Sequence, residues 1–172
     1  MILIALGANL PSRFGPPLET LAAARRAMRA RGLDIIAQSS TWLTAPVPVS
    51  DQPWYHNEVV AVRTALSPFS LLQTLQDIEE DFGRVRTVRN APRVLDLDLI
   101  GYNRTILSKP ELIVPHPRMH KRAFVLLPLR EIAPDWVHPV LEAELKTLIN
   151  SLPCDQKAVP VQNDRDLFLE RR

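Results

Sequence analysis

Two strand-like segments follow one another directly between two helix-like segments, and this order limits the folds that the chain can adopt. The first helix is predicted from about Pro17 to Arg31, and the second follows Ser67 as its N-cap and ends at Gly83. Between them, "LDIIAQSSTWLT" and "YHNEVVAVRTAL" are typical of strands. A doubly wound parallel fold requires strict alternation of strands and helices, so this order argues against it.

An apolar run at the start of the chain and an alternating segment after the second helix supply the outer strands. They are "MILIAL" and "VLDLDLIGYN". Strand, helix, strand, strand, helix, strand is the order of a ferredoxin-like unit, an antiparallel sheet covered by helices on one face. Two further helices, predicted over residues 121–127 and in "LEAELKTLINSL", could cover the other face. We therefore expect an α+β fold with a mainly antiparallel sheet.

The connections and the chain length complete the expected organisation. The segment "APVPVSDQPW" is predicted to be a long surface loop, because its three prolines prevent continuous strand pairing. "RTIL" is expected to pair back on the preceding strand through a turn at Tyr102 and Asn103. A chain of 172 residues fits one domain, expected over residues 1–155, with a partly disordered tail over residues 156–172.

Composition and charge narrow the classes of protein and partner. With 46% hydrophobic and 23% charged residues, the composition is that of an ordinary globular protein. A net charge of +2 is a weak electrostatic footprint, so no nucleic-acid partner is expected. The first apolar run is too short for a signal peptide or a membrane span, and a single cysteine, Cys154, agrees with a reducing compartment. We expect a cytoplasmic protein that binds no membrane.

The charge excess is concentrated in one segment, "RVRTVRNAPRVLDLD", from Arg84 to Asp98. It holds four arginines and two aspartates, whereas the rest of the chain has 17 basic and 17 acidic residues. Residues two apart in a strand share a face, so Asp96 and Asp98 would point the same way, about 6.6 Å apart at their Cα atoms. Magnesium suits such a pair, because it binds one or two carboxylates together with water and substrate phosphates. D-x-D is a weak motif, and a solvated strand face is the alternative.

The arginines of this segment favour the metal hypothesis. "RVRTVRNAPR" lacks helical periodicity and is predicted to be a mobile loop that leads into the strand of the two aspartates. Arginine binds phosphate oxygens two at a time, and cations beside metal-binding carboxylates are what phosphoryl transfer needs. A basic loop that merely pairs with neighbouring acids is the alternative. The chain has neither a "GxxxxGK[ST]" nor a "GxGxxG" segment, so any ATP would be held in another way.

The spacing of residues in a predicted helix and a predicted strand indicates four further residues that could contact a ligand. Gln76 and Glu79 lie beside the apolar stripe of the second helix, where either could contact a ligand, and Glu79 could instead pair with an arginine. Tyr55 and Asn57 share a face at the start of a strand. An aromatic ring beside an amide suits a flat heterocycle, although a tyrosine at a strand end can equally belong to the edge of the core.

Five blocks of the chain carry a resemblance to a known family: "LGANL", "DQPWYHNEVV", "LLQTLQDIEEDFGRVR", "APRVLDLDLI" and "VPHPRMHKRAFVLLPLREIAP". They resemble the 6-hydroxymethyl-7,8-dihydropterin pyrophosphokinases of the folate pathway, over roughly residues 1–135. The fourth block, with the "GRVR" before it, and "VPHPRM" are the most specific. The resemblance implies a ferredoxin-like α-β-α sandwich, and transfer of the pyrophosphoryl group of ATP to the hydroxymethyl oxygen of the dihydropterin, with release of AMP.

The resemblance also implies roles for individual residues. Two magnesium ions would bridge the triphosphate with Asp96 and Asp98 as protein ligands, and Arg84 and Arg93 would assist the transfer. The implied pterin contacts are Gly7, Thr44, Tyr55, Asn57 and Phe124. The implied ATP site comprises Gln76, Glu79, Arg86, Leu99, Leu112, Ile113, His116 and Arg122.

The chain departs from the common bacterial pattern of this family at several positions. The segment between Arg84 and Arg93 is one residue shorter, and Asn90 lies near the place of its usual tryptophan. Glu111 stands where an arginine is often found, and Pro117 where a tyrosine is common. We expect these differences to affect the closure of the loop and the affinity for ATP rather than the chemistry.

These observations predict a monomeric, magnesium-dependent pyrophosphokinase that acts mainly by positioning its substrates and neutralising their charge. A nucleotidyltransferase is the alternative enzyme, because it also uses an Asp-x-Asp metal pair but attacks the α-phosphorus. A ferredoxin-like RNA-binding module is the non-enzymatic alternative, and the lack of an RNP-type aromatic motif argues against it.

Overall fold

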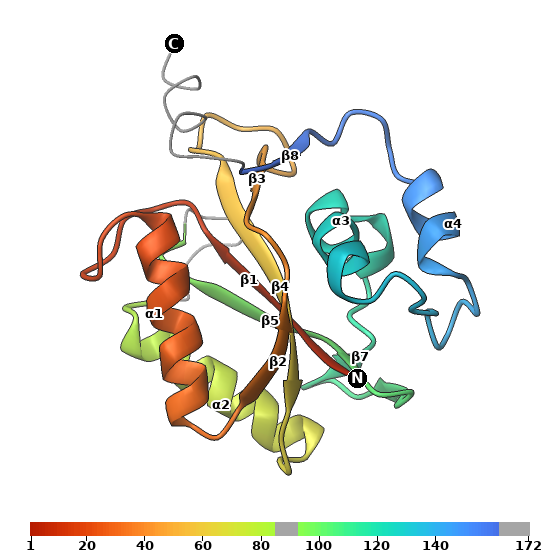
Figure 1. The fold of residues 1–172 in the computed structure, drawn as a ribbon, viewed down its shortest axis with the longest axis horizontal. Helices are drawn as coiled ribbons and strands as arrows, with labels where there is room; N and C mark the ends of the chain where they lie inside the picture. Colours follow the sequence, from red (N-terminus) through yellow and green to blue (C-terminus); the bar gives the residue numbers. More distant parts are fainter. Residues whose placement is uncertain (85–92, 162–172) are drawn as a thin grey trace.

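The first five predicted elements up to the second helix, and the strand after it, appear in the predicted order, with the second strand divided in two. A computed structural model of the protein describes residues 1–84 and 93–161. Its elements are, in order, β1 (Ile2–Ala8), α1 (Pro17–Ala30), β2 (Asp34–Gln38), β3 (Trp42–Thr44), β4 (Tyr55–Arg63), α2 (Pro68–Asp81), β5 (Asp96–Tyr102), β6 (Leu107–Ser108), β7 (Ile113–Val114), the 3-10 helix η1 (Met119–Lys121), α3 (Ala123–Ile132), α4 (Leu145–Asn150) and β8 (Ala158–Pro160) (Figure 1).

The main sheet has the strand order β5-β1-β4-β3-β8, and β2 also pairs with β4. All of these pairings are antiparallel. Strand β1 lies between β4 and β5 and is buried along its whole length, which explains why its sequence is continuously apolar. The predicted ferredoxin-like α+β fold with an antiparallel sheet is confirmed.

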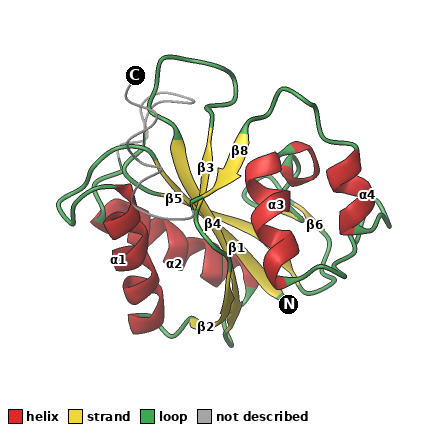
Figure 2. Ribbon diagram, turned by 45° about the horizontal axis from the view of Figure 1, so that its top comes forward, coloured by secondary structure: helices red, strands yellow, loops and turns green. Residues whose placement is uncertain are grey.

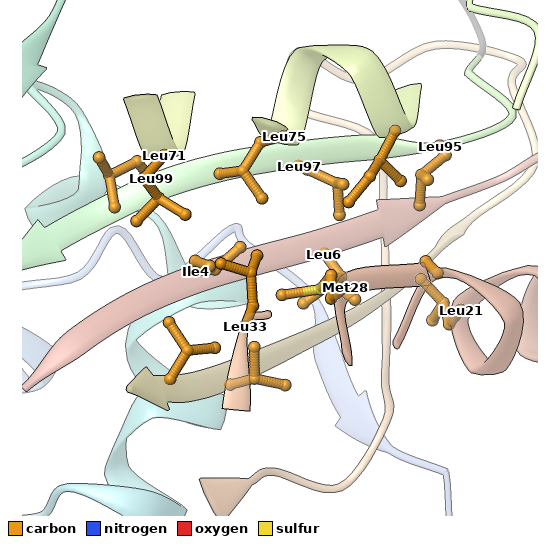
Figure 3. Close-up of a cluster of buried hydrophobic side chains, with 14 of the residues drawn as sticks. Ile4, Leu6, Leu21, Met28, Leu33, Leu71, Leu75, Leu95, Leu97 and Leu99 are labelled. Carbon is orange, nitrogen blue, oxygen red and sulfur yellow. The ribbon is translucent and has the colours of Figure 1, made fainter. Parts of the chain in front are cut away.

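Helices cover both faces of the sheet (Figures 1 and 2). Helices α1 and α2 pack on one face, where Ile4 and Leu6 of β1 meet Leu21 and Leu75 (Figure 3). Helices α3 and α4 pack on the other face, where residues such as Leu3 belong to a second core. Consecutive residues of β1 therefore enter opposite cores. No helix in the part of the chain that the structure describes is long and apolar enough to cross a membrane.

The predicted second strand, "LDIIAQSSTWLT", is wrong as a single element. Strand β2 pairs with β4 as far as Gln38 opposite Val60, and β3 resumes the pairing at Trp42 opposite Asn57. Three residues on one side, 39–41, therefore face two on the other, and the extra residue interrupts the ladder. Ser39 still holds the interruption to β4, because its hydroxyl accepts a hydrogen bond from the Val59 N–H at 3.0 Å.

The predicted hairpin between "RTIL" and the preceding strand is also wrong. Leu107 and Ser108 pair instead with Val114 and Ile113 in a separate two-stranded sheet. The edge of β5 is taken by the chain that follows, because the His116 N–H donates to the Ile100 carbonyl at 2.9 Å. Helix α3 extends further than the predicted residues 121–127, to Ile132, and α4 is shorter than the segment "LEAELKTLINSL".

The main sheet includes a strand that lies after residue 155, in the segment predicted to be a tail. Strand β8, Ala158–Pro160, pairs with β3 and forms the edge of the main sheet. The sequence "AVP" is too short for a reliable strand prediction, and its partner lies more than 100 residues earlier in the chain. The remainder of the predicted tail, residues 162–172, lies outside the described residues.

Candidate active site

A cavity of about 320 Å³ lies at one end of the sheet, where β1 finishes and β4 and β5 begin. Its floor is the sheet face that carries α3, and its rim is the loop over residues 45–54. The residues that line it are Ala5, Leu6, Gly7, Thr44, Ala45, Pro46, Val47, Pro48, Ser50, Gln52, Tyr55, Asn57, Arg93, Asp96, Asp98, His116, Arg118, Arg122 and Phe124.

Gly7 sits at the centre of the cavity floor. The strand register places it opposite Asn57 of β4 on one side and Asp96 of β5 on the other, so the three residues form one row across the sheet. A Cβ atom on Gly7 would lie only 2.6 Å from Asn57 Oδ1. Glycine is therefore needed here to leave room for the Asn57 amide, whose Nδ2 donates to Thr44 Oγ1 at 2.6 Å.

The structure brings all the residues of the predicted pterin site to this cavity: Gly7, Thr44, Tyr55, Asn57 and Phe124. Four of them come from the sheet, and Phe124 comes from the first turn of α3. The Tyr55 hydroxyl donates to Gln52 Oε1 at 3.2 Å, which ties the ring to the rim loop. A cavity lined by a buried amide and two aromatic side chains suits a flat, polar heterocycle.

The two aspartates lie on one face of β5, as their spacing predicted. Asp96 and Asp98 line the cavity, whereas Leu97 and Leu99 between and beyond them are buried in the core on the other face. Asp96 Oδ1 lies 2.9 Å from Arg84 Nη1 and 2.9 Å from Arg93 Nη1. One carboxylate oxygen thus holds arginines from both ends of the segment 84–93.

Burial and the neighbouring carboxylate change the electrostatics of Asp98. Desolvation, followed by the charge of Asp96, raises the pKa of Asp98 to about 6, and Arg122 and Arg93 oppose this rise. Within residues 1–84 and 93–161, no group of three or more His, Cys, Asp or Glu side chains could hold a metal ion. A pair of carboxylates facing a cavity still fits magnesium, which takes one or two protein carboxylates and fills its shell with water and phosphate oxygens.

Glu79 does not line the cavity, although it was predicted to contact ATP. The residue is 1% exposed on α2, its Oε1 accepts a hydrogen bond from the Leu97 N–H at 2.8 Å, and it forms an ion pair with Arg84. Burial raises the pKa of Glu79 to about 7, against the lowering effect of the Leu97 hydrogen bond. Since Leu97 lies between the two aspartates, Glu79 anchors the part of β5 that carries them.

A cationic wall also lines the cavity, and the charge of its Arg122 opposes the rise in the pKa of Asp98. It contains Arg122, which was predicted, and Arg118, which was not. Burial and then the charges of Arg122 and Arg118 lower the pKa of His116 to about 4, so its ring is neutral at pH 7. His116 Nδ1 accepts a hydrogen bond from the Arg118 N–H at 3.2 Å. The spacing of Arg118 and Arg122, four residues apart in "PRMHKR", was the available signal for the second arginine.

Asn9 is a second residue that the sequence analysis missed. It is 3% exposed, its Nδ2 donates to Gln52 Oε1 at 3.2 Å and to the Pro53 carbonyl at 3.1 Å, and its Oδ1 accepts from the Arg93 N–H at 3.0 Å. Asn9 therefore joins the rim loop to the end of the arginine segment. The position of Asn9 in "LGANL", directly after the strand that ends in the cavity, was the sequence feature that could have indicated its role.

Several predicted ATP residues lie outside the cavity. Leu99 and Leu112 are buried in the core under α1 and α2, Ile113 is 44% exposed on β7, and Gln76 is half-buried on α2. Arg84 does not line the cavity, and its ion pair with Asp96 connects it to the site. The predicted residues Arg86 and Asn90 lie outside the described residues, whereas Glu111 and Pro117 are exposed.

Comparison with known protein families shows to which family the chain belongs. The model of the 7,8-dihydro-6-hydroxymethylpterin-pyrophosphokinase (HPPK) family matches residues 3–134. The chain belongs to the HPPK family. The resemblance seen in the sequence is thereby confirmed, and with it the class of activity, a pyrophosphokinase of folate biosynthesis.

Relatives from bacteria and a fungus support this assignment. A 2-amino-4-hydroxy-6-hydroxymethyldihydropteridine pyrophosphokinase of Synechocystis is 43% identical over 153 residues, 88% of this chain and 75% of that protein. The protein of the same name from Haemophilus influenzae is 43% identical over 137 residues, 79% of this chain and 83% of that one. The folic acid synthesis protein fol1 of Pneumocystis carinii is 40% identical over 139 residues, which are 81% of this chain and only 18% of the fungal protein.

Among solved structures, the HPPK-DHPS triple mutant of Plasmodium falciparum in complex with SDX-DHP has a TM-score of 0.67 and 17% sequence identity. The match covers 87% of this chain and 43% of the Plasmodium chain. This likeness shows a shared fold. The chain thus corresponds to the HPPK part of some longer relatives and to most of the length of the bacterial ones.

Proposed function

We propose that this chain transfers the pyrophosphoryl group of ATP to the hydroxymethyl oxygen of 6-hydroxymethyl-7,8-dihydropterin and releases AMP. The observation that carries the proposal is the row Asn57, Gly7, Asp96. It puts an amide suited to a pterin edge and a carboxylate suited to a metal on either side of one glycine, about 10 Å apart across two strand spacings. A heterocycle held at Asn57 would therefore carry its substituent toward the aspartates.

The pterin would bind between the aromatic side chains of Tyr55 and Phe124. The amide of Asn57, which Thr44 holds in place, would form hydrogen bonds with the polar edge of the pterin ring. Gly7, which has no side chain, would let the ring approach the sheet closely. All of these groups belong to a pre-formed cavity, so binding would need little reorganisation of the sheet.

Asp96 and Asp98 would hold magnesium, and we propose that two ions bind together with ATP. When bound, magnesium neutralises phosphate charge and orients the triphosphate. Arg84, Arg93, Arg118 and Arg122 would bind phosphate oxygens and stabilise the charge that develops during transfer. No base is needed at the substrate hydroxyl in this scheme, because the acceleration comes from positioning and charge neutralisation.

The adenosine part of ATP would lie beyond the cationic wall. We retain Gln76, Arg86, Leu99, Leu112, Ile113 and His116 as proposed ATP contacts, with Leu99 and Leu112 acting through their backbone because their side chains are buried. For Glu79 we propose an indirect role, since its carboxylate is engaged by Leu97 and Arg84.

Product analysis tests the proposed reaction. The protein is incubated with ATP, MgCl₂ and 6-hydroxymethyl-7,8-dihydropterin, and the nucleotides and pterins are separated by chromatography. We expect AMP and a pyrophosphorylated pterin in equal amounts. Release of pyrophosphate with a nucleotidylated pterin would identify a nucleotidyltransferase and overturn the proposal.

Replacement of Asp96 by alanine tests the proposed metal site. We expect turnover to fall by more than about 100-fold, because one of two carboxylate ligands is lost. The thermal unfolding temperature should change by only a few degrees, since Asp96 lies at the cavity and not in a core. Asp77→Ala on α2, which removes an exposed carboxylate, is the matched control. Activity that survives EDTA, or near-normal turnover in Asp96→Ala, would refute the metal role.

We also propose that the protein acts as a monomer in the cytoplasm. The support for a monomer is that the described residues of one chain bring the predicted pterin residues and both aspartates to a single cavity. Light scattering coupled to size-exclusion chromatography would show a mass near 19.4 kDa.

A further inference from the structure

Gln156 binds the backbone on both sides of Arg122. Its Oε1 accepts a hydrogen bond from the Ala123 N–H at 2.8 Å, and its Nε2 donates to the Lys121 carbonyl at 2.7 Å. Ala123 is the first residue of α3, and Arg122, the N-cap residue, makes no side-chain capping bond. Gln156 therefore satisfies the first amide of α3 from a distant part of the chain, in place of a local capping side chain.

The residues that follow Gln156 are attached to a second wall of the cavity, which β3 forms. The Lys157 carbonyl accepts a hydrogen bond from the Ala45 N–H at 3.0 Å, and Ala158 pairs with Thr44 in the sheet. The Val161 N–H donates to the Thr41 carbonyl at 2.8 Å. The segment thus runs from the start of α3 to the outer edge of β3, where Figure 2 shows β8 beside β3.

Both ends of this connection reach residues that line the cavity. Thr44 and Ala45 belong to the β3 wall, and Arg122 and Phe124 belong to the α3 wall. Gln156 itself does not line the cavity. The segment therefore joins two walls that have no adjacent residues in the sequence.

We propose that Gln156 is a positioning residue for substrate binding, which fixes the distance between the β3 wall and the α3 wall. This inference rests on the proposed function, because it takes the cavity as the pterin site. It concerns a part of the chain beyond residue 134, where the match to the HPPK family model ends. Without Gln156, the backbone of residues 121–123 would lose two hydrogen bonds, and the side chains of Arg122 and Phe124 would sample more positions.

Steady-state kinetics of Gln156→Ala test the proposal. We expect kcat/KM for the pterin to fall about tenfold, mainly through a higher KM, because two hydrogen bonds hold the wall that carries Phe124. Gln73→Ala is the matched control, since Gln73 is exposed on α2, donates to Asp77 Oδ1 and does not line the cavity. It should keep the wild-type constants.

The KM distinguishes positioning from a purely structural role. If Gln156 served stability alone, Gln156→Ala would lower the unfolding temperature and the active fraction while the KM for the pterin stayed at its wild-type value, and this result would overturn the proposal. Gln156→Glu keeps the acceptor for Ala123 but sets an oxygen against the Lys121 carbonyl, so we expect it to raise the KM as well. A wild-type KM in that variant would show that the two-sided attachment is unnecessary.

Hydrogen–deuterium exchange gives a readout that does not depend on activity. In Gln156→Ala, amides of residues 122–126 and 43–45 should exchange faster, whereas those of β1 should not change. Unchanged exchange in both segments would overturn the role of Gln156 even in an active enzyme. If wild-type protein forms no AMP, the proposed function fails by itself, and the exchange result still decides whether Gln156 holds the two walls.

Discussion

Gly7 is where the two halves of the site meet, because its neighbours across the sheet are Asn57 and Asp96. In Gly7→Ala, the new methyl group would displace the Asn57 amide, whose Oδ1 would be 2.6 Å away. We expect the KM for the pterin to rise about tenfold or more, as after the loss of a buried hydrogen bond. Steady-state kinetics check this.

Gly101→Ala is the control for the same change of residue. A Cβ atom at Gly101 of β5 would meet Leu3 Cδ1 at 3.8 Å, an ordinary contact, so this variant should keep the wild-type KM. Equal constants for Gly7→Ala and the wild type would contradict the role given to the close approach at Gly7.

His116 predicts a specific dependence of stability on pH. Burial, with Arg122 and Arg118, lowers its pKa from 6.5 to about 4. Between these values the unfolded chain binds more protons than the folded one, so the free energy of unfolding falls as the pH decreases below about 6.5. Relative to His116→Gln, the wild type should lose about 1–2 kcal/mol between pH 7.5 and pH 5.

Urea denaturation of both proteins at the two pH values measures this loss. Comparison with the variant is necessary because burial also lowers the pKa of His56 and of His138. The same pH dependence in His116→Gln and in the wild type would show that His116 is not the group that titrates.

Residue-level prediction from the sequence succeeded where local spacing decides orientation. Asp96 and Asp98 alternate with leucines, and alternation in a strand fixes which side chains share a face. Glu79 shows the limit, because helical spacing placed it beside an apolar stripe but could not say that it is buried against Leu97. That contact depends on how α2 packs on β5, which is a tertiary property.

Asn9 acts at the scale of elements, since it joins the rim loop to the start of β5. Asn9→Asp keeps the acceptor for the Arg93 N–H but removes the donor to Gln52 and Pro53. We expect this variant to raise the KM for the pterin several-fold with a smaller effect on kcat, because only the rim loop is released. Asn9→Ala removes both sets of bonds and should reduce kcat as well.

Asn103→Asp serves as the control for the Asn9 variants. Asn103 lies after the far end of β5 and accepts a hydrogen bond from the N-terminal amine at 2.8 Å, away from the cavity. Its replacement should leave both constants unchanged. If Asn9→Asp and Asn9→Ala had identical kinetics, the two sides of Asn9 would not act separately.

The interruption after β2 and the strand β8 were not predicted from the sequence, and both omissions have the same physical cause. Ser39 and Ser40 read as part of a strand, but the extra residue there is visible only in the register with β4. Strand β8 has only three residues and is formed by pairing with β3. Contacts that are distant in sequence decided both cases, whereas the Ser67 cap of α2, a local signal, was predicted correctly and accepts from the Ser70 N–H.

At the scale of the whole molecule, two cores on opposite faces of one sheet hold the site at the sheet's end. Leu75 is fully buried in the core under α1 and α2, on the face away from the cavity. We expect Leu75→Ala to lower the free energy of unfolding by about 2–5 kcal/mol, through lost burial and a residual cavity. The KM values of the folded fraction should not change.

Urea denaturation measures this loss, and Phe69→Ala on the same helix is the control. Phe69 is 44% exposed, so its replacement should cost less than about 1 kcal/mol. A loss of stability in Leu75→Ala similar to that in Phe69→Ala would show that this core is less tightly packed than the burial of its residues indicates.

The two arginines that Asp96 binds would have to be replaced when a metal ion binds to its carboxylate. Its Oδ1 is shared by Arg84 and Arg93, so a cation that takes this oxygen must displace both guanidinium groups. The displaced groups then need an anion, and a polyphosphate arriving with its metal brings one. Metal alone would leave the two arginines without an anion, and phosphate alone would leave the arginines on Asp96. We therefore expect the complex of metal and polyphosphate to bind more tightly than either does by itself.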